Sequence, residues 1–271
     1  MENIVRFEKN SFGKRMKSML NVDFRRMFKS KLFYILIACA LVIPILMTVM
    51  MTMMDGSVSV DPQTGVETII HGPENAWQSI GTLPTADGAA MGGMDVMAMC
   101  NINMMFMLVA VFICLFISDD FRSGYAKNLF TVRVKKGDYV ISKTLAGFIC
   151  GAFMLIAYFI GAMLGGAISG LSFDLAGLTV GNIVMCMIAK IFLMLVFVAI
   201  FVLVSVAAKQ IAWLSICGSL GGGMLLFMMV GMITPLSSTM MNVALCFAGG
   251  ALFAVGLGAI GKVVLKKTSL V

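Results

Sequence analysis

The sequence predicts an all-α polytopic membrane protein with six transmembrane helices, on the evidence of its composition, its apolar blocks and its distribution of cations. Hydrophobic residues make up 60% of the 271 residues, and charged residues make up only 12%. A soluble domain carries about 25% charged residues. The apolar residues also form long blocks rather than the alternating patterns of strands or of surface helices. This composition places the chain in a membrane.

Six apolar blocks are long enough to cross a bilayer. A span needs about 20 mostly apolar residues, because the hydrocarbon core is about 30 Å thick and a helix rises about 1.5 Å per residue. Helices are expected because backbone groups in lipid must be satisfied within their own segment. The predicted spans are 32–54, 98–117, 144–168, 181–207, 211–233 and 242–261.

The cations are confined to a few short stretches of the chain. None occurs from Leu32 to Ser118, whereas many occur in residues 1–31 and 119–143. Of the 20 Lys and Arg residues, all but Lys190 lie in those two stretches or at Lys209, Lys262, Lys266 and Lys267. Because cytoplasmic loops retain Lys and Arg, this distribution reports which segments face the cytoplasm.

The distribution predicts that both termini are cytoplasmic. With six spans, the cation-rich stretches all lie on one side, and the loop 118–143 is cytoplasmic. The loop 55–96 carries acids and no Lys or Arg, so it is expected outside. The net charge of +7 therefore reflects a basic inner surface rather than nucleic-acid binding.

Residues 1–31 are predicted to form a cytoplasmic segment with an interfacial helix. Apolar residues recur with a period near 3.6 and form one face of that helix, at Phe12, Met16, Met19, Leu20, Phe24, Met27 and Phe28. Such a helix can lie among the headgroups of membrane lipids. Asp23 sits among the apolar positions with Arg26 one turn later, which suits either a local ion pair or a contact for a cytoplasmic partner.

Small residues in two spans predict close helix packing. Gly161 and Gly165 lie in the third span, and Gly250 and Gly258 lie in the sixth, each pair at a multiple of four residues. Small side chains at such spacing let two helices approach closely.

The chain shows no enzymatic motif. Residues 256–263 nearly match a phosphate loop, but Val263 replaces the hydroxyl that would hold magnesium. The one histidine, His71, lies in the predicted outer loop, so no metalloprotease pair is present. Asp and Glu are also absent from the interiors of the predicted spans, where ion-coupled carriers usually place them. We expect neither catalysis nor an ATP site in this chain.

Lys190 is the one cation inside an apolar block. The favoured interpretation is that its side chain reaches the outer headgroups, as amphipathic side chains do. The functional alternative is that Lys190 faces an internal cleft and meets a substrate carboxylate along the substrate path.

Four sulfur-bearing residues offer a weaker hypothesis. Met91, Met94, Met97 and Cys100 recur every third residue at the mouth of the second span. Thioethers and thiols suit Cu(I), so copper-related transport is a minor alternative. Adaptable apolar packing is the simpler interpretation of these methionines, and no metal site is predicted.

The loop between the second and third predicted spans carries an ordered set of charged and special residues. Two acids end the second span, a Gly and two cations follow, and a Tyr and a Lys open the third span: Asp119, Asp120, Gly124, Lys127, Arg133, Tyr139 and Lys143. This pattern resembles the corresponding loop of ABC-2 type permeases, the membrane subunits of one class of ATP-binding-cassette exporters. The basic lead-in from Val22 to Leu36 also looks like the start of family members.

The resemblance implies a coupling role for this loop. It implies two copies of a separate ABC ATPase, which bind ATP and magnesium, and a second copy of this permease or a related one. The loop would then be both a topological anchor and a surface for the ATPase. The expected coupling residues are those of the motif together with Arg122, Asp23 and Arg26.

The function expected on this basis is an ABC-type exporter permease in a bacterial cytoplasmic membrane. Its substrate is expected to be amphipathic or hydrophobic, with a peptide toxin or antimicrobial peptide as the leading candidate. Two alternatives remain open: a passive channel or ion-coupled carrier, and a membrane protein for peptide immunity or assembly that transports nothing.

Overall fold

The computed structural model describes residues 12–60, 67–69, 72–81, 101–131, 136–175 and 177–267. Arg133 and the four sulfur residues Met91, Met94, Met97 and Cys100 lie outside these ranges. Within them the regular secondary structure is helical, apart from one short antiparallel ribbon of β1 (Val58–Val60) with β2 (Glu67–Ile69) and an isolated bridge between Asn75 and Ser172. The helices are α1 (Phe12–Lys29), α2 (Lys31–Met53), η1 (Ala76–Ser79), α4 (Met104–Arg122), α5 (Tyr125–Thr131), α6 (Lys136–Ile168), α7 (Val180–Ala208), α8 (Ala212–Ile233) and α9 (Met240–Lys267).

Five of these helices are long and apolar enough to cross a membrane: α2, α4, α6, α7 and α9. The prediction of a multi-span helical membrane protein is therefore confirmed. Helix α8 is also apolar, but its stretch suited to the membrane, Ala212–Phe227, is shorter. The described residues thus establish five candidate spans, and the count of six and the orientation stay predictions.

The helices between 98 and 168 differ in extent from the predicted spans. The second span was expected over 98–117, but α4 begins at Met104 and continues to Arg122. The loop expected over 118–143 contains the end of α4, the short helix α5 and the first turns of α6. Helical structure therefore reaches beyond the apolar blocks into the charged stretch.

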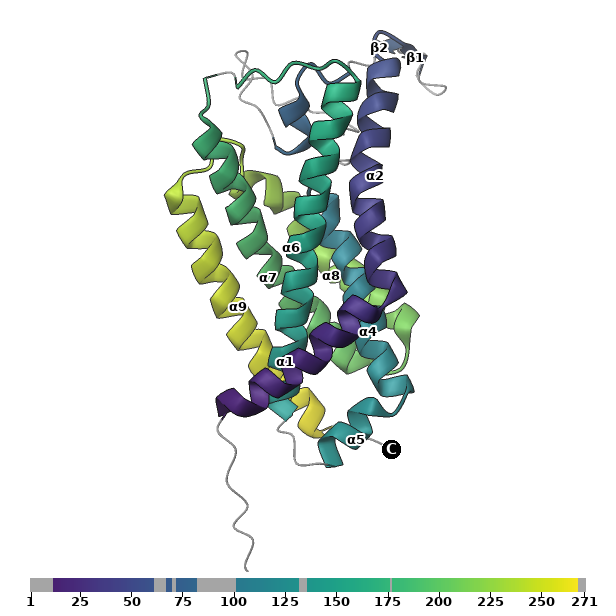
Figure 1. Ribbon diagram of the computed structural model, residues 1–271, viewed down its shortest axis with the longest axis vertical. Helices are drawn as coiled ribbons and strands as arrows, with labels where there is room; N and C mark the ends of the chain where they lie inside the picture. Colours follow the sequence, from purple (N-terminus) through teal and green to yellow (C-terminus); the bar gives the residue numbers. More distant parts are fainter. Residues whose placement is uncertain are drawn as a thin grey trace, which may run out of the picture.

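Helix α1 lies across one end of the bundle, and α5 is found at the same end (Figure 1). Its apolar face is buried through Met16, Met19 and Met27, while Lys14 and Lys29 are exposed. The amphipathic helix predicted from the 3.6-residue period is present, and its buried face packs against α6 and α2.

Close helix contacts occur at the predicted glycines. A Cβ added at Gly161 of α6 would lie 2.2 Å from the carbonyl oxygen of Leu41 in α2. A Cβ at Gly250 of α9 would lie 2.8 Å from the carbonyl oxygen of Phe192 in α7. Two helix pairs, α2 with α6 and α7 with α9, therefore pack backbone to backbone because these residues lack a side chain.

Residues 72–81 form a small cap at the opposite end of the bundle from α1. The side-chain amide of Asn75 donates to the carbonyl of Asp174, and the Trp77 indole donates to that of Phe173. Within this cap, Ala76 and Ile80 are fully buried. The loop between the first two spans is thus packed onto the bundle, at least in this part.

Candidate functional site

A buried charged cluster joins α1, α4 and α6 at the end of the bundle where α1 lies. Its centre is Lys143 of α6, whose Nζ lies 2.7 Å from Oδ1 of Asp23 in α1 and 2.7 Å from Oδ2 of Asp120 in α4. The exposed fractions of the three side chains are 1%, 2% and 0%. One ammonium therefore bridges carboxylates from two other helices in a site closed to bulk solvent.

Neighbouring polar groups complete the hydrogen bonding of both carboxylates. Ser142 donates to Oδ2 of Asp23 at 2.5 Å, and the Tyr139 hydroxyl donates to Oδ2 of Asp120 at 2.9 Å. Arg26 donates from Nη1 to Oδ1 of Asp120 at 2.5 Å. Buried charges are stable only when they are paired and hydrogen-bonded in this way.

The cluster balances two acids, Asp23 and Asp120, against two cations, Lys143 and Arg26. Breaking a buried pair of this kind costs about 3–5 kcal/mol, because the remaining charge is left without compensation. The cluster therefore fixes how α1, α4 and α6 sit relative to one another.

Two aromatic rings cover the cations of the cluster. The Lys143 ammonium lies 4.1 Å from the centre of the Phe116 ring, and the Arg26 guanidinium lies 4.4 Å from that of Tyr125 in α5. Cations attract the faces of aromatic rings at such distances. Helix α5 is thereby attached to the cluster through Arg26.

Burial and charge also shift the pKa values of the outer members of the cluster. Burial raises the pKa of Tyr125, and the nearby carboxylates of Asp23 and Asp120 raise it further. For Arg26, burial lowers the pKa, but the attraction and hydrogen bond of Asp120 outweigh burial and raise it above its usual value. Arg26 therefore stays charged and Tyr125 stays neutral near pH 7.

A second ion pair fastens α1 to α6. Nε of Arg15 lies 3.0 Å from Oδ2 of Asp138, which is buried in the first turn of α6. An acid in the first turn also interacts favourably with the helix dipole. Together with Asp23, this pair holds α1 along α6 at two points.

The predicted coupling residues fall into two groups. Asp23, Asp120, Tyr139 and Lys143 are buried and bond to one another, and Arg26 is partly covered between them and Asp119. The exposed group consists of Asp119, Arg122 and Lys127. The exposed group offers its side chains to another protein, and the fully buried group does not. The sequence left open whether Asp23 pairs locally with Arg26, and here each pairs with a residue of another helix instead.

Gly124 has a structural role in the turn between α4 and α5. Its φ of 71° lies in the left-handed region, which residues with a Cβ rarely adopt. Its carbonyl then accepts a hydrogen bond from the amide of Asn128. The Gly of the predicted motif therefore lets the chain reverse so that α5 follows α4 directly.

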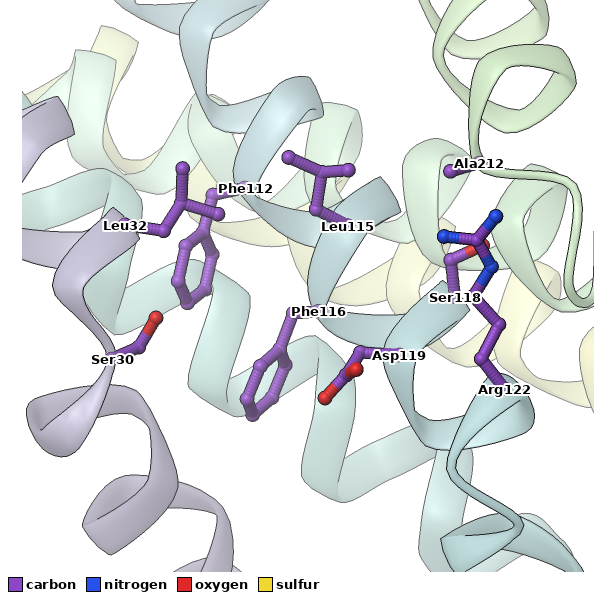
Figure 2. Close-up of a pocket in the computed structure, with 9 residues that line it drawn as sticks. All are labelled: Ser30, Leu32, Phe112, Leu115, Phe116, Ser118, Asp119, Arg122 and Ala212. Carbon is purple, nitrogen blue, oxygen red and sulfur yellow. The ribbon is translucent and has the colours of Figure 1, made fainter.

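A hollow of about 260 Å³ opens beside the exposed group. Its walls come from the junction of α1 and α2, from α4 and from the start of α8 (Figure 2). Figure 2 shows Asp119 beside Phe116, and Arg122 with its guanidinium turned towards Ala212. The lining residues are Ser30, Leu32, Phe112, Leu115, Phe116, Ser118, Asp119, Arg122 and Ala212. The hollow thus has apolar walls and a charged rim.

Lys190 lies on α7, away from the charged cluster, and is completely buried. Its Nζ donates to Oδ1 of Asn103 at 2.7 Å and to Oγ1 of Thr234 at 3.0 Å. The interpretation that its side chain reaches the outer headgroups is therefore wrong, because its ammonium turns into the bundle. Lys190 also does not face an open cleft in this conformation.

Sequence reasoning named Lys143 and its partners Asp23 and Asp120, but it missed Ser142, which donates to Asp23, and both partners of Lys190. Ser142, Asn103 and Thr234 are ordinary polar residues beside or between apolar blocks, and nothing in their spacing singles them out. Asp138 carried a weak signal, as an acid at the start of a span. Among the residues that the structure describes, no group of three His, Cys, Asp or Glu could hold a metal ion.

One of the comparisons with known proteins identifies a family for the chain. A model of the ABC-2 family transporter proteins matches residues 19–221, which include the second half of α1, the charged cluster and Lys190. No curated protein and no solved structure matched the chain. Since the match covers well over half of the sequence, the chain belongs to the ABC-2 family of transporter membrane proteins.

Proposed function

We propose that the chain is the permease subunit of an ABC-type exporter that is driven by a separate ATPase. Two copies of the permease, or this chain with a related one, would assemble with two ATPase subunits in a bacterial cytoplasmic membrane. ATP and magnesium would bind to the ATPases, and this chain would need no cofactor of its own. All six apolar helices would span the membrane, with both termini inside.

The main support for the proposal is that exposed cations lie next to a buried charged cluster at one end of the bundle. Arg122 and Lys127 are exposed at the end of α4 and on α5. Directly behind them, Arg26 and Lys143 tie α1, α4 and α6 together through Asp120. An ATPase that binds the exposed cations would thus push on an element that is firmly attached to two candidate spans and to α1.

This arrangement suggests how ATP binding moves the spans. Closure of the two ATPases would displace α5, and α5 is joined to α4 by the tight turn at Gly124. Because Asp120 and Lys143 are bonded across the cluster, α4 and α6 would move as one body rather than slide past each other. The buried residues are then positioning residues for the coupling, and the exposed ones form its contact surface.

The substrate we propose is amphipathic or hydrophobic, with a peptide toxin or antimicrobial peptide as the leading candidate. The support is the composition of the spans, which are apolar and contain many of the 27 methionines. Methionine side chains are flexible and polarisable, so surfaces rich in Met can adapt to varied apolar ligands.

Charge reversal at the exposed surface tests the coupling. In Arg122→Glu/Lys127→Glu, we expect the ATPase to be lost from the purified complex, because two attractive contacts become repulsive. The matched control is Lys262→Glu/Lys266→Glu, which reverses two exposed cations on α9 at the same end of the bundle. Full retention of the ATPase by the first variant would leave these cations as topological anchors only.

Cysteine labelling tests the orientation. In a background without native cysteines, Thr68→Cys and Lys127→Cys should react with an impermeant reagent from opposite sides of the membrane. Thr68 lies on β2, beyond α2, and Lys127 lies on α5. Labelling of both positions from one side would contradict the six-span arrangement.

A further inference from the structure

The hydrogen bonds of Lys190 differ from those of an ordinary buried lysine. An ammonium has three donors, and Lys190 uses two of them on neutral oxygens, Oδ1 of Asn103 and Oγ1 of Thr234. Within the residues that the structure describes, no carboxylate lies at ion-pair distance from it. The site therefore holds a positive charge that the described chain solvates but does not neutralise.

Both partners of Lys190 stand at helix ends, whereas Lys190 itself is inside α7. Asn103 is the residue before α4, and its side chain makes no capping bond with that helix. Thr234 is the residue after α8, and its hydroxyl also donates to the carbonyl of Val230. Asn103 thus directs its side-chain oxygen at Lys190 instead of at its own helix.

This placement makes the ammonium easy to release. A movement of the ends of α4 and α8 away from α7 would break both bonds without disturbing the middle of any helix. The freed ammonium would then lie in a buried part of the bundle beside Cys186, one turn earlier on α7. In a site of low polarity, an anion gains more from such a charge than it would in water.

We propose that Lys190, Asn103 and Thr234 form a binding site for a carboxylate on an amphipathic molecule. The carboxylate replaces the two neutral oxygens when the ends of α4 and α8 separate from α7. In the proposed orientation these ends face the outside, so the site would be met late in export. This inference rests on the proposed function only for that role, since binding itself requires no ATPase.

The test is equilibrium binding to the full chain in lipid nanodiscs without the ATPase. The probes are a dansylated Ala-Leu-Leu-Phe peptide as its free acid and the same peptide as its C-terminal amide. We expect the wild type to bind the acid at least about tenfold more tightly than the amide, a difference of about 1.4 kcal/mol. Because no ATPase is present, failure of the coupling proposal would not affect this result.

Two variants remove the unmatched charge at Lys190 in different ways. Lys190→Met removes the charge, and Asn103→Asp places a carboxylate of the same shape beside it, filling the site from within. Both should bind acid and amide within about twofold of each other, and Asn103→Asp should also unfold at a higher temperature than the wild type. If Lys190→Met fails to fold, Asn103→Asp still decides the question.

The control variant is Lys262→Met, which removes an exposed cation at the other end of the molecule and should keep the preference for the acid. Laurate and lauramide distinguish the source of the carboxylate. Preference for laurate assigns the site to any amphipathic carboxylate, and preference confined to the peptide assigns it to a peptide C-terminus. Equal binding of acid and amide by the wild type, or a preference that persists in either folded variant, would overturn the proposal.

Discussion

Among the residues that the structure describes, the two fully buried lysines, Lys143 and Lys190, have opposite kinds of partners. Lys143 bridges two carboxylates, and Ser142, Tyr139 and Arg26 complete the bonding of those acids. Lys190 has two neutral oxygens and, in the described chain, no acid. The first site is satisfied by groups of the protein itself, whereas the second retains an unmatched charge.

This contrast shows how one bundle can fix its helices at one end and leave them able to exchange hydrogen-bond partners at the other. A charge that is neutralised from several helices locks them in place, and moving them apart exposes unpaired ions. A charge held by neutral groups at helix ends can exchange those groups for another ligand at lower cost. We therefore propose rigid coupling at the end with Lys143 and ligand recognition at the end with Lys190.

The largest effect is expected from replacing the two lysines by the same residue. Lys143→Met leaves Asp23 and Asp120 buried with only Arg26 to balance them, and should cost about 3–5 kcal/mol of unfolding free energy. Lys190→Met loses two hydrogen bonds but also removes a costly charge, and should change stability by no more than about 1 kcal/mol. Denaturant or thermal unfolding in a mild detergent measures both. Equal losses of unfolding free energy in the two variants would show that the two lysines do not differ in their contribution to stability.

A smaller effect separates the two adjacent acids of α4. Asp120→Asn weakens the bonds from Lys143, Arg26 and Tyr139, and should cost roughly 1.5–3 kcal/mol because those bonds involve charged groups. Asp119→Asn is the matched control, since the Asp119 side chain is 71% exposed and pairs with Arg26 only at 3.6 Å. An exposed pair contributes about 0–1 kcal/mol. A loss at Asp119 as large as that at Asp120 would show that the buried cluster does not carry the stability of this end.

The smallest effect concerns the uncharged partners. Ser142→Ala removes one bond to Asp23, which keeps its bond to Lys143, and should cost about 0.5–1.5 kcal/mol. Thr234→Val removes one of two bonds to Lys190, and should cost at least as much because only Asn103 then remains. The same unfolding measurement checks both variants. A clearly smaller loss at Thr234 than at Ser142 would mean that Lys190 depends little on its neutral partners.

The sequence predicted the membrane class, the amphipathic helix and the close helix pairs, because those depend on local patterns. Apolar blocks of about 20 residues indicate spans wherever they occur, and Gly161 and Gly250 lie where their helices touch. The charged stretch was less predictable. The apolar block alone predicted that the second span ends near residue 117. Helix α4 continues to Arg122, and Asp120 is buried within it because Lys143 compensates its charge.

The roles of individual site residues depended on contacts that a sequence does not display. The family motif marked Asp119 and Asp120 alike, yet one is exposed and the other buried, since neighbouring residues on a helix point in different directions. Lys190 was recognised as unusual, but its partners lie 87 and 44 residues away along the chain. Only the packing of α4, α7 and α8 brings these three together.

We propose that an ATPase drives this permease through the cluster around Lys143, and ATP turnover by the assembled complex in nanodiscs measures this coupling. The informative variant is Asp23→Asn/Lys143→Met, which removes one acid and one cation together and leaves the exposed Arg122 and Lys127 unchanged. We predict that the wild-type permease stimulates ATP turnover, and that the variant binds the ATPase equally well without stimulating it. Unchanged turnover when the wild-type permease is added, or full stimulation by the variant, would contradict the account.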